Sequence, residues 1–149
     1  MPLTLIKEDG TGKADANAYA NVADGDAYHA GHLYASAWTA ATADNKAVAL
    51  VMASRLIDAE YQFGGTRAVA SQALQWPRED CPDPDAGDMV AETMVPKAVV
   101  EAACELAREL IITDRTAEPE LFPAPQSIDL TAWQRASPTN RCYSSNIPV

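Results

Sequence analysis

The chain has 149 residues and a net charge of −10, with 48% hydrophobic residues. This length suits one domain and is too short for two of ordinary size. An acidic balance without any run of Lys or Arg disfavours a surface for duplex DNA, because such a surface must displace counterions from phosphates. Residues 1–8 do not show the pattern of a signal peptide, and no apolar run reaches about 18 residues. We therefore expect a protein of a reducing cytoplasm without membrane contact.

The three cysteines are Cys81, Cys104 and Cys142. Their wide spacing, without a CxxC pair or alternation with histidine, indicates neither a zinc site nor a disulfide framework. Cys104 falls within a helical pattern, where we expect a small buried hydrophobic residue.

Two short apolar runs, residues 3–6 and 18–22, lie on either side of a glycine turn at residues 8–12. We interpret them as a small β-hairpin or as two short strands at the edge of the domain. Gly10 and Gly12 surround Thr11 like the beginning of a phosphate-binding loop. The rest of that signature is missing, which favours a simple turn.

Three helices are predicted next, at about residues 23–31, 43–61 and 96–113. Asn21 and Thr42 can cap the first two, and a proline opens the third. Apolar residues at three- and four-residue steps place one face of the second and third helices inward. The sequence thus predicts a mainly α fold: a small bundle of about three main helices with a short N-terminal β-hairpin, a long inter-helix loop and an extended C-terminal tail.

The stretch between the last two helices, residues 64–95, is long for a compact domain and contains an acidic, proline-broken run. Connections of this length usually carry function or reach outward. We therefore predict that residues 64–88 contact a partner instead of joining the core, with Trp76 as the anchor and Arg78 paired to an acidic neighbour. In the alternative, Trp76 and Trp38, the latter expected in a loop, fill the edges of the core, as large aromatic side chains commonly do.

The amino-acid composition of the chain changes after Asp114. Five prolines in the remainder exclude long helices, and apolar residues are spread among them. We expect a helical domain over residues 1–114 and an extended docking tail over residues 115–149. The side chains expected to make partner contacts in this tail are Phe122, Leu130, Trp133 and Tyr143.

The sequence contains few motifs that indicate metal binding or catalysis. The acidic loop at residues 80–88 lacks the ligand spacing of an EF-hand, and we interpret it as solvated, with a bound cation left open. His29 and His32 have no further zinc ligands nearby and are expected as partly exposed helix-end residues. Neither a G-x-S-x-G motif nor an activated cysteine is recognisable. We therefore expect no enzyme activity, no metal and no other cofactor.

A series of landmarks runs along the chain in a characteristic order. They are Glu8–Gly12, Asn17–Tyr19, Asp26–His29, Trp38, Asp58–Tyr61, Gly65–Arg67, the Gln72–Arg78 block QALQWPR, and Val95–Pro96. In this order, from about Leu5 to Leu110, the sequence resembles a family of small tailed-phage proteins encoded near the portal and capsid genes. Members of that family are often labelled DnaT-like single-strand-binding proteins and look like the head-tail connector (adaptor) proteins of long-tailed phages.

The resemblance implies a structural subunit of the virion neck, made in the cytoplasm of the bacterial host. Copies would assemble as a homo-oligomeric ring, twelve-fold in such adaptors, beneath the portal protein. The ring would extend the DNA channel and dock the next neck or tail-completion protein, and DNA would pass through without specific binding. An acidic lumen suits this role because it repels the duplex and keeps it mobile.

Two other functions stay in competition with the adaptor. The first is a DnaT-like accessory protein that binds single-stranded DNA, as the family label suggests. The second is a small metal-dependent enzyme built on the acidic residues 80–88.

Overall fold

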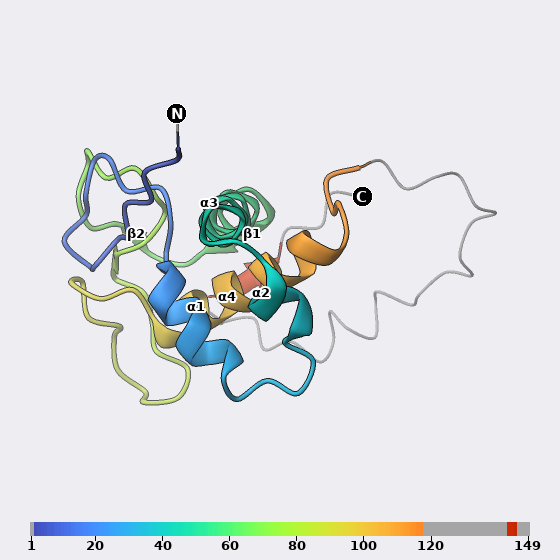
Figure 1. Cartoon of the computed structure of the whole chain (residues 1–149). Helices are drawn as coiled ribbons and strands as arrows, with labels where there is room; N and C mark the ends of the chain where they lie inside the picture. Colours follow the sequence, from blue (N-terminus) through green and yellow to red (C-terminus); the bar gives the residue numbers. More distant parts are fainter. Residues whose placement is uncertain (1, 118–142, 146–149) are drawn as a thin grey trace.

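The computed structural model describes residues 2–117 and 143–145, which form helices and short strands (Figure 1). The helices are α1 (Val22–His29), α2 (Ser36–Ala40), α3 (Ala43–Glu60) and α4 (Lys97–Ile112). The strands are β1 (Tyr61–Phe63), β2 (Thr66–Arg67), β3 (Arg78–Glu79) and β4 (Tyr143–Ser145). The predicted mainly α fold is confirmed. Phe122, Leu130 and Trp133 of the predicted tail lie outside the described residues.

Helices α3 and α4 pack against each other, and α1 and α2 pack on α4 (Figure 1). In α4 the buried Val99, Ala103 and Ala107 recur at four-residue steps, so one side of the helix faces inward. Leu50 and Ile57 belong to the buried side of α3. Alanine buries little apolar area, so larger side chains must complete the core. No helix within the described ranges is long and apolar enough to cross a membrane.

The predicted capping residues begin two of the helices. The Asn21 side chain accepts a hydrogen bond from Asp24 N, and the Asp24 carboxylate accepts one from Asn21 N, which makes a reciprocal capping box. Thr42 Oγ1 accepts from Asn45 N at the start of α3. Helix α2, which carries Trp38, was expected to be a loop, because its five residues are too few to show a helical period.

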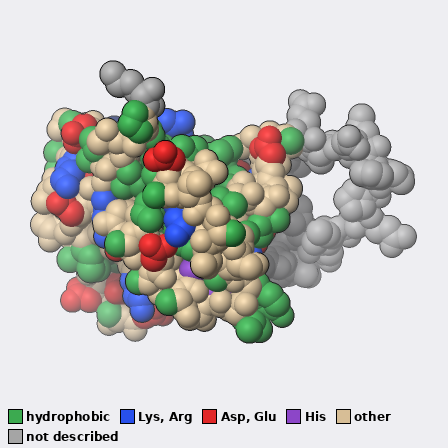
Figure 2. Space-filling view, in the orientation of Figure 1, with side chains coloured by type: hydrophobic (Ala, Val, Ile, Leu, Met, Phe, Trp, Pro, Cys, Tyr) green, Lys and Arg blue, Asp and Glu red, His purple; other side chains and the backbone are tan. Residues whose placement is uncertain are grey.

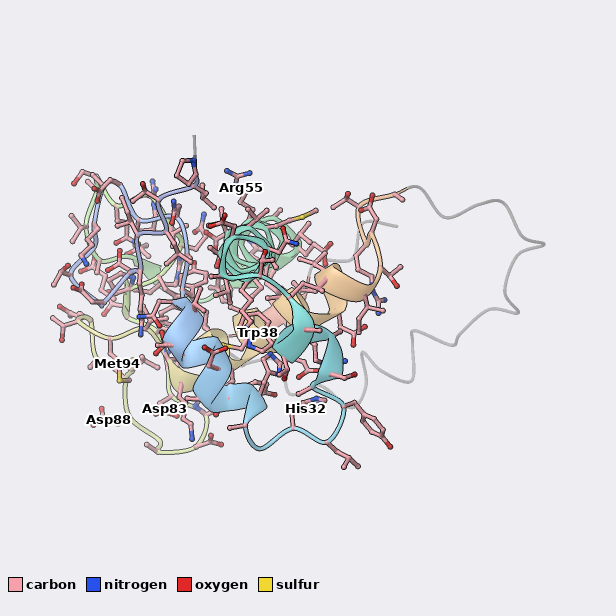
Figure 3. All side chains as sticks on the ribbon, viewed as in Figure 1. His32, Trp38, Arg55, Asp83, Asp88 and Met94 are labelled. Carbon is pink, nitrogen blue, oxygen red and sulfur yellow. The ribbon has the colours of Figure 1, made fainter. Side chains whose placement is uncertain are left out.

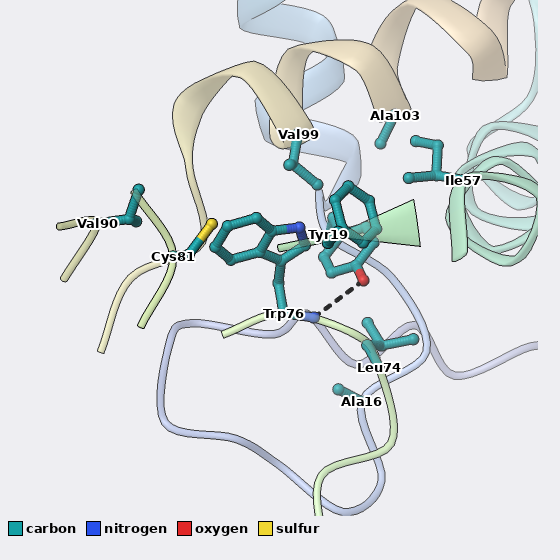
Figure 4. Close-up of a cluster of buried hydrophobic side chains, with 10 residues drawn as sticks. Ala16, Tyr19, Ile57, Leu74, Trp76, Cys81, Val90, Val99 and Ala103 are labelled. Carbon is teal, nitrogen blue, oxygen red and sulfur yellow. Dashed lines mark hydrogen bonds between the residues drawn. The ribbon is translucent and has the colours of Figure 1, made fainter. Parts of the chain in front are cut away.

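Two buried tryptophans organise two hydrophobic clusters. Trp76 packs with Tyr19 and Ile57 in one cluster (Figure 4), and Trp38 packs with Leu50 in the other. Leu106 of α4 packs against both clusters. The interpretation that Trp38 and Trp76 fill the core is confirmed.

The long stretch after α3 belongs to this core, and the prediction that it reaches outward is wrong. Trp76 is 0% exposed and Arg78 is 7% exposed. The Gln72 side chain shows how the loop is buried. Its amide nitrogen donates to the carbonyls of Leu74 and Pro77, and its amide oxygen accepts a backbone N–H. An irregular loop that satisfies its own backbone groups in this way can join a core without a partner.

The N-terminal segment forms a parallel contact instead of the predicted hairpin. Lys7 and Ala18 form an isolated parallel bridge. Between them the chain winds around Glu8, which is 0% exposed and accepts hydrogen bonds from three backbone N–H groups within residues 10–13. This path around a buried carboxylate differs from a hairpin turn, and it places the second run inside the domain, where Ala18 is fully buried.

The cysteines differ from the prediction in one respect. Cys81 is disulfide-bonded, whereas the wide spacing of the cysteines indicated no disulfide framework. Distances along the chain do not reveal which cysteines folding brings together. Cys104 is a free and buried thiol, as predicted.

Replacing Trp76 with alanine is expected to destabilise the domain by about 3–5 kcal/mol, because the change leaves a large cavity beside Tyr19. Urea denaturation followed by far-UV circular dichroism measures this loss. Tyr34→Ala is the control, since Tyr34 is 72% exposed and its removal should change stability by no more than about 0.5 kcal/mol. Equal stability of the Trp76→Ala variant and the wild type would contradict the placement of Trp76 in the core.

Candidate assembly surface

A buried polar network around Tyr19 holds the loop that carries Trp76. The Tyr19 hydroxyl donates to the Asp58 carboxylate and accepts from Gln75 N at 3.1 Å. It also accepts from Trp76 N at 3.3 Å, the bond drawn as a dashed line in Figure 4. Burial raises the pKa of the Asp58 carboxyl. Burial, together with the neighbouring Asp58, also raises the pKa of the Tyr19 hydroxyl. The network fixes the loop to α3 and keeps Trp76 away from any partner.

The Arg78 guanidinium is also occupied inside the domain. Its Nε donates to the Gly64 carbonyl at 2.6 Å, and its Nη2 donates to the Gly65 carbonyl at 2.8 Å. Its Nη1 donates to the Gln75 carbonyl at 3.1 Å. These bonds close the turn between β1 and β2 onto the loop. The prediction that Arg78 pairs with an acidic residue of a partner is therefore wrong.

Most cations in the described part of the chain are paired with carboxylates. Six of the nine Lys and Arg side chains of residues 2–117 form ion pairs: Lys7–Asp24, Lys13–Asp9, Lys46–Asp26, Lys97–Glu101, Arg108–Glu105 and Arg115–Glu109. The backbone N–H groups of the glycine turn bind Glu8, so they are not available to a phosphate. A nucleic-acid backbone would have to displace these carboxylates, which weakens the attraction that drives such binding.

The loop between α1 and α2 presents two large hydrophobic side chains to solvent. Leu33 is 85% exposed and Tyr34 is 72% exposed. Hydrophobic side chains project from the surface at this edge of the molecule, beside the labelled His32 (Figures 2 and 3). The loop is held in place, because Tyr34 N donates to His32 Nδ1 at 3.0 Å and Arg108 Nη1 lies 3.5 Å from Tyr34 O. A fixed, exposed Leu–Tyr pair is a candidate protein–protein contact, since tyrosine is enriched in interfaces.

A groove of about 710 Å³ lies between the end of α3, β1 and the outer side of α4. Its apolar lining consists of Leu56, Ile57, Phe63, Ala98, Val99, Ala102 and Leu106. Tyr61 and four charged side chains complete the lining, the charged ones being Glu60, Glu105, Glu109 and Arg115. Ile57 and Val99 also belong to the cluster around Trp76, so the floor of the groove is the outer surface of the core. We refer to it below as the α3–α4 groove.

His29 and Cys104 meet where α1 packs on α4. His29 is 4% exposed, which corrects the expectation of a partly exposed residue, and its Nε2 lies 3.0 Å from the Cys104 carbonyl. Burial lowers the pKa of His29 and raises the pKa of the Cys104 thiol to about 12. The imidazole contacts the backbone carbonyl of Cys104, and a thiol with a raised pKa stays protonated, whereas a cysteine nucleophile acts as a thiolate. The contact between His29 and Cys104 therefore contributes to the packing of α1 on α4.

The acidic loop forms a closed turn at the edge of the molecule (Figure 3). The Asp83 carboxylate accepts from the N–H groups of Asp85 and Ala86, and Pro82 and Met89 form an antiparallel bridge behind them. Asp83 is thus a turn-forming residue. In residues 2–117 and 143–145 no group of three or more His, Cys, Asp or Glu side chains is arranged to hold a metal ion.

The described end of the tail pairs within its own chain. β4 is antiparallel to β1, with Tyr143 opposite Phe63. The pairing concerns the backbone, so the predicted partner contact of the Tyr143 side chain stays a prediction. Sequence reasoning missed the Leu33–Tyr34 pair, although two large apolar residues just after Gly31, outside any helical pattern, are a usable signal. The α3–α4 groove leaves no such signal, because it exists only once α3, β1 and α4 are assembled.

The structure defines a class: a small, mainly α domain with two tryptophan-centred clusters, paired surface charges and a fixed apolar loop. A family model described as "Putative DnaT-like ssDNA binding protein" matches residues 3–125. The chain belongs to this family. Comparisons with curated proteins and with solved structures gave no match. The family match confirms the DnaT-like part of the resemblance and does not address the head-tail connector part.

Protonation of His29 is expected to destabilise the protein at acidic pH. Because burial lowers the pKa of His29 below its ordinary value of 6.5, the unfolded chain binds a proton here over a range of pH in which the folded chain does not. The stability that His29 contributes is therefore fully present above pH 6.5 and is lost as the pH falls through the pKa of the folded state.

Urea denaturation between about pH 7 and about pH 5 measures this dependence. His29→Gln keeps a donor for the Cys104 carbonyl and should flatten the fall in stability, whereas His32→Gln should leave it in place. An unchanged slope in the His29→Gln variant would show that another group is responsible.

Proposed function

We propose that this chain is a structural subunit that acts through protein–protein contacts, as a head-to-tail adaptor in the neck of a tailed phage. Copies form a ring beneath the portal protein, twelve-fold as in such adaptors. The ring extends the DNA channel and docks the next neck or tail-completion protein. The observation that carries the proposal is the loop between α1 and α2, which holds Leu33 and Tyr34 in solvent at 85% and 72% exposure.

A fixed apolar loop supports assembly for an energetic reason. Leaving a leucine and a tyrosine in water forgoes the free energy of burying them, and a protein contact recovers it. The hydrogen bond from Tyr34 N to His32 reduces the entropy that ordering the loop on binding would cost. A loop that meets a different face of the next copy makes a heterologous contact, the kind that closes rings.

The net charge of the protein supports a channel through which DNA passes without being bound. With a net charge of −10, the protein repels DNA at long range, which suits a channel through which DNA slides. The paired cations of residues 2–117 leave few positive groups to hold a phosphate in passing.

Binding of single-stranded DNA is the second candidate, and the description of the matched family favours it. Proteins of that function stack bases on exposed aromatic side chains in a positively charged groove. Here Trp38 and Trp76 are buried, and the exposed aromatic side chains among the described residues are Tyr34 and Tyr61. The burial of both tryptophans and the pairing of the cations favour the adaptor.

The variant Leu33→Ser/Tyr34→Ser tests the assembly surface. It should keep its melting behaviour, since both side chains are exposed, but it should lose rings on the portal protein of the same phage in negative-stain electron microscopy. Val48→Ser is the matched control, because Val48 is a half-exposed apolar residue on α3 that should leave the rings intact. Normal rings from the double variant would remove this loop from the interface.

Fluorescence anisotropy with labelled single-stranded oligonucleotides separates the two candidate functions. We expect no submicromolar binding at physiological salt, because a binder must release counterions with free cations. Submicromolar binding that weakens steeply with salt, and that Tyr34→Ser reduces, would favour the single-strand-binding function instead.

A further inference from the structure

The backbone of Tyr34 is held on both sides by polar contacts that connect the loop between α1 and α2 to α4. Tyr34 N donates to His32 Nδ1 at 3.0 Å, and His32 Nε2 lies 3.2 Å from Glu105 Oε2. Arg108 Nη2 donates to Glu105 Oε1 at 2.6 Å, and Arg108 Nη1 lies 3.5 Å from Tyr34 O. The contacts therefore form a closed cycle that begins and ends at Tyr34, next to the labelled His32 (Figure 3).

The contacts of His32 define which of its ring nitrogens carries a proton. Nδ1 accepts a hydrogen bond from a backbone N–H, so it has no proton in this arrangement. The neutral ring then carries its proton on Nε2, the nitrogen beside the Glu105 carboxylate. A second proton would have to enter at Nδ1, where it would face the N–H of Tyr34 as donor against donor.

We propose that His32 is a pH-sensitive latch on the Leu33–Tyr34 loop, which the neutral imidazole holds and the imidazolium releases. Histidine is the side chain that in ordinary surroundings changes its charge between about pH 5 and about pH 8. The side chain of His32 is 21% exposed, so protons from the solvent reach it. Protonation strengthens its contact with Glu105, which becomes an ion pair, and abolishes the hydrogen bond from Tyr34 N. The imidazole therefore stays on α4 while the loop is released.

The groups that face His32 do not titrate in its place. Burial lowers the pKa of His29 on α1, so this second imidazole stays neutral to a lower pH than an ordinary histidine. Burial also raises the pKa of the Tyr28 hydroxyl, which stays neutral. Burial opposes the effect of Arg108 on Glu105, but the hydrogen bond from Arg108 holds the pKa of Glu105 below its ordinary value, so the carboxylate stays ionised. Helix α2 contains no charged residue.

The latch deepens the proposed function, because its consequence for assembly rests on the role of the Leu33–Tyr34 loop as an interface. A loop that is already held meets a partner with little further loss of conformational entropy, whereas a released loop must be ordered on binding. Rings on the portal protein should therefore form less readily at about pH 5 than at about pH 7, the range in which histidine becomes charged.

Amide hydrogen exchange, followed by NMR on the full chain, tests the latch without any partner. Protection of the Tyr34 amide, corrected for the intrinsic exchange rate, should fall on the order of ten-fold from about pH 7 to about pH 5, because one hydrogen bond is lost. The Asn45 amide is the internal control, since it donates to Thr42 Oγ1, an exposed acceptor that does not titrate. Its protection should be equal at both pH values. Unchanged protection of the Tyr34 amide would overturn the latch.

Two variants separate a latch from a merely structural role of His32. Asparagine can place its Oδ1 where the imidazole has Nδ1, so His32→Asn should keep the Tyr34 amide protected at both pH values. His32→Ala provides no acceptor and should leave this amide unprotected at both. Protection that still depends on pH in either variant would assign the titration to another group and overturn the proposal.

Negative-stain electron microscopy with the portal protein tests the consequence for assembly. The wild type should form fewer rings at the lower pH, and His32→Asn should form the same number at both. Rings that ignore the pH, from a wild type whose Tyr34 amide loses its protection, would contradict the loop's role in the proposed function and leave the latch standing. A Tyr34 amide that ignores the pH would contradict the latch alone.

Discussion

The hydroxyl of Tyr19 joins three parts of the chain that are distant in sequence. It donates to Asp58 of α3 and accepts from the backbone N–H groups of Gln75 and Trp76, while Tyr19 N donates to Ser54 Oγ at 3.0 Å. These bonds satisfy polar groups that would otherwise be costly to bury. They let an irregular loop enter the core and carry Trp76 with it. The cluster between α3 and α4 is built around that side chain, because the two helices supply only Ile57, Val99 and Ala103 to its buried members.

The burial of the loop determines what the surface can do. With Trp38 and Trp76 inside and most described cations paired to carboxylates, the outside of the domain is acidic and has few aromatic side chains. The exceptions are the apolar Leu33–Tyr34 loop and the α3–α4 groove, whose floor is apolar and whose lining includes charged side chains. A surface of this kind favours contacts with protein over contacts with phosphates.

The family description and the chemistry of the domain point in different directions. The description names single-stranded DNA, whereas stacking platforms and free cations are what such binding requires. The adaptor proposal accounts for the acidic charge and for the fixed apolar loop together. Tyr34 belongs to both accounts, as an interface residue in one and a stacking residue in the other, so variants of this residue discriminate between them.

The sequence by itself determined the local structure. The caps Asn21 and Thr42, the apolar period of α3 and α4 and the turn at Gly10–Gly12 depend on neighbours within a few residues, and all were predicted. Only the tertiary structure decided that Trp76 and Arg78 are buried. It also decided the parallel path around Glu8, the disulfide of Cys81 and the presence of the groove. Each of these depends on partners many residues away, because a buried polar group or cysteine is satisfied by whichever group the fold brings to it, and no local pattern records which one that is.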